Sequence, residues 1–74
     1  MDKNIYSSSA FIRLLRAKYN LDIADIGTIL EMTYSDIKDM LNGRTQLGRD
    51  NYFKIIEHIG EEIQCDYTGT YGEY

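Results

Sequence analysis

The stretch LDIADIGTILEMTYSDI, residues 21–37, contains two helix-start signals that follow one another closely along the chain. Asp22 and Thr33 are residue types whose side chains accept hydrogen bonds from the first amides of a helix. Apolar residues recur after each of them at the spacing of a buried helix face. They are Ile26, Ile29 and Leu30 after the first signal, and Ile37, Met40 and Leu41 after the second. The stretch therefore predicts two helices separated by one tight turn.

The segment before this pair has the pattern of a first helix. Ser7, Ser8 and Ser9 can cap its start, and Asn20 is expected to end it. Its apolar positions recur at helical spacing, with basic residues on the other faces. The apolar positions are Phe11, Leu14, Leu15 and Tyr19.

A fourth helix is expected after a loop. Residues 42–43, Asn-Gly, should stop the third helix, and residues 44–49 have few apolar side chains, which is typical of a loop. Asp50 can then cap a helix that ends at Gly60. The side chains expected to point inward from this helix are Tyr52, Phe53, Ile55, Ile56 and Ile59.

Residues 62–67 alternate strictly between polar and apolar types, which is the pattern of a β-strand. The expected inner face carries Ile63, Cys65 and Tyr67. Cys65 is best interpreted there as a small hydrophobic residue. We expect this strand either to pair with a second copy of the chain or to cover the core.

The length of 74 residues allows one core, so we expect a single domain. Its parts would be an N-terminal arm at residues 1–9, a helical core at 10–60 and an acidic strand or tail at 61–74. A core this small gains from a partner chain, so a homodimer is expected. The net charge of −4 is unusual for a nucleic-acid-binding domain. However, eight basic and eight acidic residues cancel through Gly60, and the excess acid follows it.

The residues from Ile12 to Gly60 resemble the Cro/CI-type (XRE-like) helix-turn-helix family of phage repressors and small bacterial regulators. The resemblance rests on IRLLR at 12–16, the stretch at 21–37, Asn-Gly at 42–43 and matches within 54–60. It implies an all-α, four- to five-helix lambda-repressor-like domain with a short C-terminal β-strand extension. It also implies a cytoplasmic, homodimeric transcriptional regulator that binds specific sequences of double-stranded DNA with a recognition helix at 33–41 in the major groove.

By this resemblance, two groups of residues meet DNA. The residues at or near the base edges would be Thr33, Tyr34, Ser35, Lys38 and Asp39. The residues against the sugar-phosphate backbone would be Asn42, Arg44, Thr45 and Arg49, and Arg49 could instead reach the minor groove. Two alternatives stay open from the residues alone. Tyr34 could be a partly buried aromatic side chain, and the basic residues after the third helix could belong to a solvated loop.

Both a matched position, Gly27, and several departures from the family pattern are informative. Gly27 replaces a small Ala where the second and third helices cross, and a bulky side chain there would push them apart. Ile23 stands where the family has a phosphate-binding Gln, and Glu31 where it has the turn Gly. On the expected recognition helix, Asp36 fits the positive end of the helix dipole. Asp39 would repel phosphates unless it accepts a hydrogen bond from a cytosine amino group.

A second hypothesis keeps the same scaffold but gives it a protein partner. The acidic surface would then bind another protein, as in an antirepressor or an antitoxin-like regulator. An enzyme is not expected, because no Ser or Cys is matched with a His and an orienting acid, and no glycine-rich phosphate loop occurs. One Cys and one His provide no metal-ligand cluster, and we expect no cofactor. Without about 18 consecutive apolar residues or a secretion signal, no membrane partner is expected.

Overall fold

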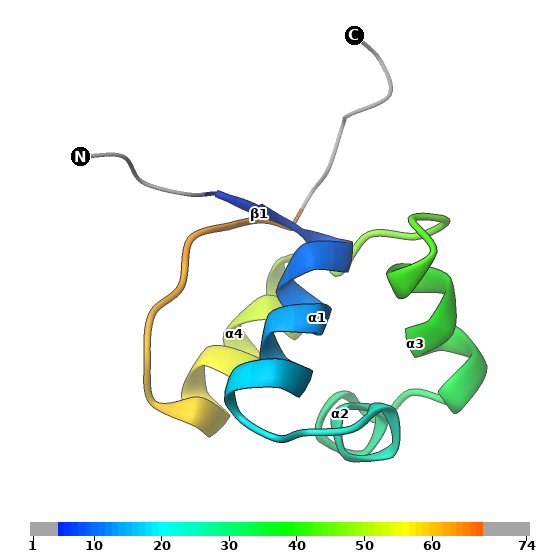
Figure 1. The fold of residues 1–74 in the computed structure, drawn as a ribbon, viewed down its shortest axis with the longest axis horizontal. Coiled ribbons are helices and arrows are strands. Elements are labelled where there is room, and N and C mark those ends of the chain that lie inside the picture. Colours follow the sequence, from blue (N-terminus) through cyan, green and yellow to red (C-terminus); the bar gives the residue numbers. More distant parts are fainter. Residues whose placement is uncertain (1–4, 68–74) are drawn as a thin grey trace, which may run out of the picture.

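The structure, a computed structural model, describes residues 5–67 of the chain. This part contains β1 (Tyr6–Ser7), α1 (Ser8–Lys18), α2 (Ile23–Leu30), α3 (Tyr34–Leu41), α4 (Arg49–Ile59) and β2 (Cys65–Asp66). Figure 1 shows α1 between α3 and α4, with α2 at one end. Helices α1 and α2 pack against α3, and α2 also packs against α4. The expectation of a small, mainly helical domain with a short C-terminal strand is confirmed for the described residues.

The starts of the first three helices are capped as the sequence predicts. The hydroxyl of Ser7 accepts a hydrogen bond from an amide in the first turn of α1. At the start of α2, the carboxylates of Asp22 and Asp25 each accept from the backbone amide of the other. Thr33 and Asp36 form the same reciprocal arrangement at the start of α3. These pairs satisfy amides that no helical carbonyl can reach, and so they set where each helix begins.

The start of α4 differs from the prediction. Asp50 does not cap the helix, which begins at Arg49, two residues before the start that a cap at Asp50 would give. The preceding residue, Gly48, has a φ of 88°, a conformation that glycine adopts without steric cost, and no side chain caps the helix. Leu47 explains this early start, because its side chain is buried and its amide donates to the hydroxyl of Ser8 at 2.9 Å. The expected loop is therefore anchored to α1.

The core is one cluster of buried side chains from all four described helices and the loop before α4. The residues that the sequence predicts correctly are Phe11, Leu15, Ile26, Leu30, Ile37, Met40, Tyr52 and Ile55. Those predicted as inward but only partly buried are Leu14, Tyr19, Ile29, Leu41, Ile56 and Ile59. Ile12, Ile23 and Leu47 complete the buried set. The prediction is wrong for Phe53, which is 46% exposed because α4 turns Tyr52 and Ile55 toward the core instead.

The C-terminal strand pairs within the chain. β2 lies parallel to β1, with Tyr6 opposite Cys65 and Ser7 opposite Asp66. The paired strand β2 is thus shorter than the alternating stretch predicted at 62–67. Its partner β1 consists of residues that were expected to belong to the N-terminal arm. The expected inner residues Ile63, Cys65 and Tyr67 pack against the core, as one of the two alternatives predicts. The remaining parts of the expected arm and tail, 1–4 and 68–74, lie outside the described residues.

We expect Glu31→Gly to be more stable than Glu31→Ala. Glu31 ends α2 with φ 59° and ψ 46°, and a side chain in this left-handed region costs about 1–2 kcal/mol. The extra freedom of glycine in the unfolded chain offsets about 0.5–1 kcal/mol of that gain. Urea unfolding followed by circular dichroism should therefore separate the two variants by about 1 kcal/mol. Both variants lack the carboxylate, so equal stabilities would contradict strain at this residue.

Stability should fall in alkaline solution as Cys65 of the unfolded chain ionises. Burial, with a smaller contribution from the Asp66 carboxylate, raises the pKa of the Cys65 thiol to about 12. Above the ordinary thiol pKa of about 8.5, the folded state therefore holds the proton more tightly, and stability is lost as the pH rises toward the folded pKa. Burial also raises the pKa of Tyr52, so the ionisation of this residue should likewise lower the stability at alkaline pH.

The measurement is the difference in unfolding free energy between the wild type and Cys65→Ala at several pH values. Tyr52 is present in both proteins, and because the charge of Cys65 contributes to the raised pKa of Tyr52, the difference measures the thiol together with its coupling to Tyr52. It should be constant near neutral pH and should shift against the wild type above about pH 9. A difference that does not change with pH would show that the thiol is not protected.

Candidate nucleic-acid interface

Helices α2 and α3 meet at a close contact between two backbone segments. The amide of Met32, in the turn, donates to the carbonyl of Gly27 at 2.8 Å. A Cβ atom on Gly27 would lie 2.8 Å from the carbonyl oxygen of Met32 and 3.8 Å from a side-chain carbon of Ile37. A backbone carbonyl cannot rotate away as a flexible side chain can. The expected need for a small residue at this crossing is therefore confirmed, and its cause is the turn itself.

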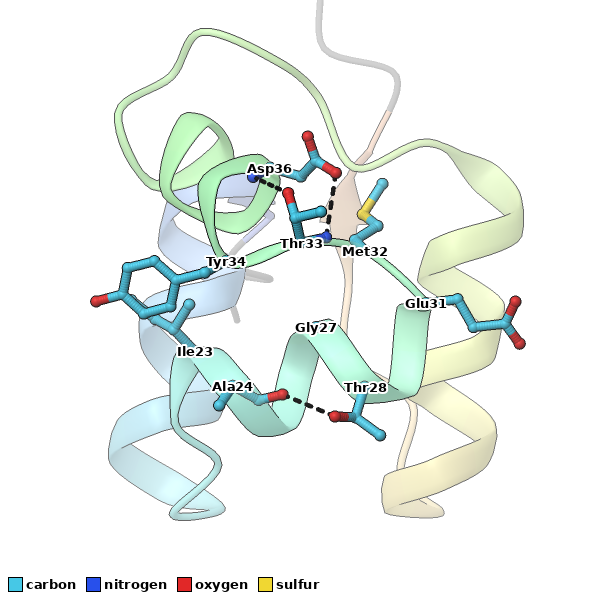
Figure 2. Close-up of a pocket in the computed structure, with 9 residues that line it drawn as sticks. All are labelled: Ile23, Ala24, Gly27, Thr28, Glu31, Met32, Thr33, Tyr34 and Asp36. Carbon is cyan, nitrogen blue, oxygen red and sulfur yellow. Dashed lines mark hydrogen bonds between the residues drawn. The ribbon is translucent and has the colours of Figure 1, made fainter.

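The first turn of α3 is fixed by Thr33 and Asp36 (Figure 2). The Thr33 hydroxyl accepts from the amide of Asp36 at 3.1 Å, and the Asp36 carboxylate accepts from the amide of Thr33 at 3.2 Å. The Thr33 side chain is thus used within the helix. The charge of Asp36 lies at the helix end where a negative charge is favoured, as the sequence indicates.

The outer face of α3 is polar and exposed, whereas its inner face is buried. Ile37 and Met40 lie in the core, and Tyr34, Ser35 and Lys38 lie in solvent. The side chain of Tyr34 is 60% exposed, so the alternative of a partly buried aromatic is wrong. The Lys38 ammonium lies 5.9 Å from the centre of the Tyr34 ring, within reach of a cation–π attraction. The structure therefore brings these three predicted residues onto one face.

Asp39 is paired with the loop that follows α3. The Arg44 guanidinium lies 3.9 Å from the Asp39 carboxylate, and the Arg44 amide donates to the Asp39 carbonyl at 2.8 Å. The Arg44 side chain is 73% exposed, so its charge also faces solvent. Asn42 and Thr45 are exposed in the same loop. The negative charge of Asp39 is therefore partly balanced by the positive charge of Arg44.

Arg49 is separate from this group. It is exposed at the start of α4, where its guanidinium lies 5.7 Å from the centre of the Phe53 ring. The expected strand residues Ile63, Cys65 and Tyr67 are also separate from the loop after α3, because they lie in or near β2. There Tyr67 stacks on Tyr52 with ring centres 4.8 Å apart. The predicted backbone contacts thus divide into a loop beside α3 and a single arginine on α4.

A shallow hollow lies between α2 and α3, with a volume of about 590 Å³. Figure 2 shows its lining residues, which are Ile23, Ala24, Gly27, Thr28, Glu31, Met32, Thr33, Tyr34 and Asp36. Sequence reasoning missed the exposed Ala24 and Thr28, although their four-residue spacing opposite the apolar positions of α2 could have revealed them. Ile23, which stands where the resembled family has Gln, is buried and offers no polar group.

No family model, no curated protein and no solved structure matches the chain. Among residues 5–67, no three His, Cys, Asp or Glu side chains lie together in a group that could hold a metal ion. Within the same range, no helix has the length and apolar character needed to cross a membrane. The geometry of the described residues is therefore the basis for a functional proposal.

Gly27→Ala should destabilise the fold by about 1–3 kcal/mol, because the added methyl group overpacks against a backbone carbonyl. The neighbouring exposed residue provides the control, since Thr28→Ala removes a hydroxyl, which bonds to the Ala24 carbonyl within α2, and one methyl group from the surface. The control should stay within about 0.5 kcal/mol of the wild type. Urea unfolding measures both changes. A Gly27→Ala protein as stable as the Thr28→Ala protein would contradict the close contact.

Proposed function

We propose that the chain is a Cro/CI-type regulator that binds specific sequences of double-stranded DNA through a helix-turn-helix formed by α2 and α3. The observation that carries this proposal is the exposed polar face of α3 above its buried apolar face. Eight residues of helix are about 12 Å long, and the major groove is about 12 Å wide and admits a helix. In this arrangement Tyr34, Ser35 and Lys38 would face the base edges.

The acidic residues of α3 are compatible with this proposal because each has a local partner. Asp36 accepts from the backbone at the helix start, and Asp39 lies beside Arg44. In the groove, Asp39 would accept from the amino group of a cytosine, and Lys38 would donate to acceptors on a guanine. A DNA phosphate would compete with Asp39 for the exposed guanidinium of Arg44. Binding would therefore depend on bases that compensate Asp39, which favours specific over non-specific sites.

The loop after α3 would supply the contacts that position the helix. Arg44, Asn42 and Thr45 are exposed in this loop, next to the end of α3. The end of α3 is itself held to α1, because the Ser9 hydroxyl donates to the Leu41 carbonyl at 2.8 Å. Contacts from a fixed loop to phosphates set orientation without carrying sequence information. Arg49 would add a further contact only where the DNA extends past this loop.

A protein partner is the second candidate function, favoured by the charges on α2. Asp22, Asp25 and Glu31 are all exposed on this helix or its end, and Ile23 provides no phosphate ligand. A basic surface on another protein would suit them better than DNA would. Under this alternative, DNA binding is weak and independent of sequence.

The deciding experiment is selection of the full chain on a pool of randomised duplexes at low salt. We expect an enriched site, to which Arg44→Ala binds more weakly and with a salt dependence lowered by about one unit in the log–log slope. Lys38→Ala should instead lose about 1–3 kcal/mol of discrimination at one base pair. Lys54→Ala is the matched control for lost charge, since Lys54 is exposed on α4.

The control should retain both the affinity and the sequence preference of the wild type. Fluorescence anisotropy with the enriched duplex and a scrambled duplex measures both quantities. If no site is enriched, or if the enriched and scrambled duplexes bind equally, the regulator proposal is wrong and the protein partner becomes the better hypothesis.

A further inference from the structure

Phe53 is a large apolar side chain that the fold leaves 46% exposed on α4. It belongs to an aromatic cluster, with its ring centre 5.1 Å from that of Tyr52 and 6.4 Å from that of Tyr67. Tyr52 is buried and Tyr67 partly buried, so Phe53 is the member of this cluster that faces solvent. Ile56, also partly buried, is on the neighbouring turn of α4. Phe53, Ile56 and Tyr67 thus form an apolar surface with one exposed ring at its centre.

Charges of opposite sign flank this ring along α4. Arg49 precedes Phe53 by four residues and Glu57 follows it by four, and both are exposed. At about 100° per residue, the three side chains lie within about 80° of one another around the helix. At 1.5 Å per residue, the backbone positions of Arg49 and Glu57 are displaced by about 6 Å from Phe53 along the axis, in opposite directions. The Arg49 guanidinium leans toward the ring and lies 5.7 Å from its centre. About 12 Å of helix axis separates the two residues, and among residues 5–67 no ion pair joins them.

We infer that this surface, defined by Arg49, Phe53, Ile56, Glu57 and Tyr67, binds a second copy of the chain. The two α4 helices run antiparallel, and the two Phe53 rings meet at a two-fold axis. Antiparallel alignment about Phe53 reverses the order of the charges, so Arg49 of one chain lies opposite the partner's Glu57. The contact occurs twice by symmetry, as in any isologous interface. The charge pattern is therefore complementary to itself, and a second copy is the occupant that it fits.

The size and position of the surface determine what kind of dimer to expect. A helix of eleven residues is about 16 Å long, so one face of it with Tyr67 buries less than the roughly 800 Å² per partner of a standard interface. Association should therefore be weak and dependent on concentration. Figure 1 shows α3 on the other side of α1 from α4, so the dimer leaves the exposed face of α3 uncovered. The inference does not depend on DNA binding.

Sedimentation velocity of the full chain, without DNA and at low salt, tests the dimer directly. We expect a reversible monomer–dimer equilibrium with a dissociation constant in the micromolar range. Phe53→Asp should abolish the dimer, whereas Phe53→Leu should retain it, because leucine keeps the centre of the surface apolar. Circular dichroism and urea unfolding check that both variants fold. A wild-type chain that stays monomeric up to millimolar concentration would overturn the inference.

A charge exchange tests the antiparallel alignment independently of Phe53. Arg49→Glu alone and Glu57→Arg alone each place like charges opposite one another at two symmetric contacts, and each should weaken the dimer by about tenfold or more. The double variant R49E/E57R restores opposite charges and should recover an affinity within a few-fold of the wild type. Arg13→Glu, the same charge reversal on exposed α1, is the control and should leave the affinity unchanged.

The rescue is specific because the two residues form no ion pair within one chain. If the double variant is as weak as the single variants, the proposed alignment of the helices is wrong. If the Arg13→Glu control weakens the dimer equally, the effect comes from net charge rather than from the contact, and the inference also fails.

Discussion

The close contact between Gly27 and the carbonyl of Met32 is the constraint on which the α2–α3 arrangement depends. It joins one backbone to another, so neither side can adjust by changing a rotamer. The hydrogen bond from the Met32 amide to the Gly27 carbonyl closes the turn at the same place. Thr33 then begins α3 immediately, and Ile37 enters the core one turn later. The direction of α3, and with it the side of the molecule that its polar residues face, follows from this contact.

The two acidic residues of α3 each have a partner within the chain. The Asp36 carboxylate accepts a hydrogen bond from the amide of Thr33 at the helix start. The Asp39 carboxylate lies beside the Arg44 guanidinium, which also faces solvent. The local balance matters more than the net charge of −4, because interactions between exposed charges weaken beyond about 8–10 Å at physiological salt. The acids outside α3, on α2 and after Gly60, therefore affect a ligand at α3 less than their number suggests.

The sequence predicts the local features of this fold well, because helix caps and tight turns depend on neighbouring residues. The caps at Ser7, Asp22 and Thr33 are correct for this reason. Features that depend on distant contacts were missed. The start of α4 is set by the burial of Leu47 against α1, and the exposure of Phe53 by the choice of Tyr52 for the core. Of the candidate site, the exposed face of α3 was predictable, whereas the pairing of Arg44 with Asp39 requires the path of the loop.

The short parallel pairing of β1 with β2 has a consequence for the connectivity of the whole chain. It places Tyr6 beside Cys65, so the first and last parts of the described chain lie next to each other. The amide of Gly48 also donates to the carbonyl of Tyr67 at 2.9 Å, which ties the same junction to the start of α4. Because the two ends of the described chain lie side by side, a chain that starts at another point could form the same helix packing. The domain therefore has the geometry of a circularly permutable unit, in which a linker could join the paired strands and new ends could open in a surface loop.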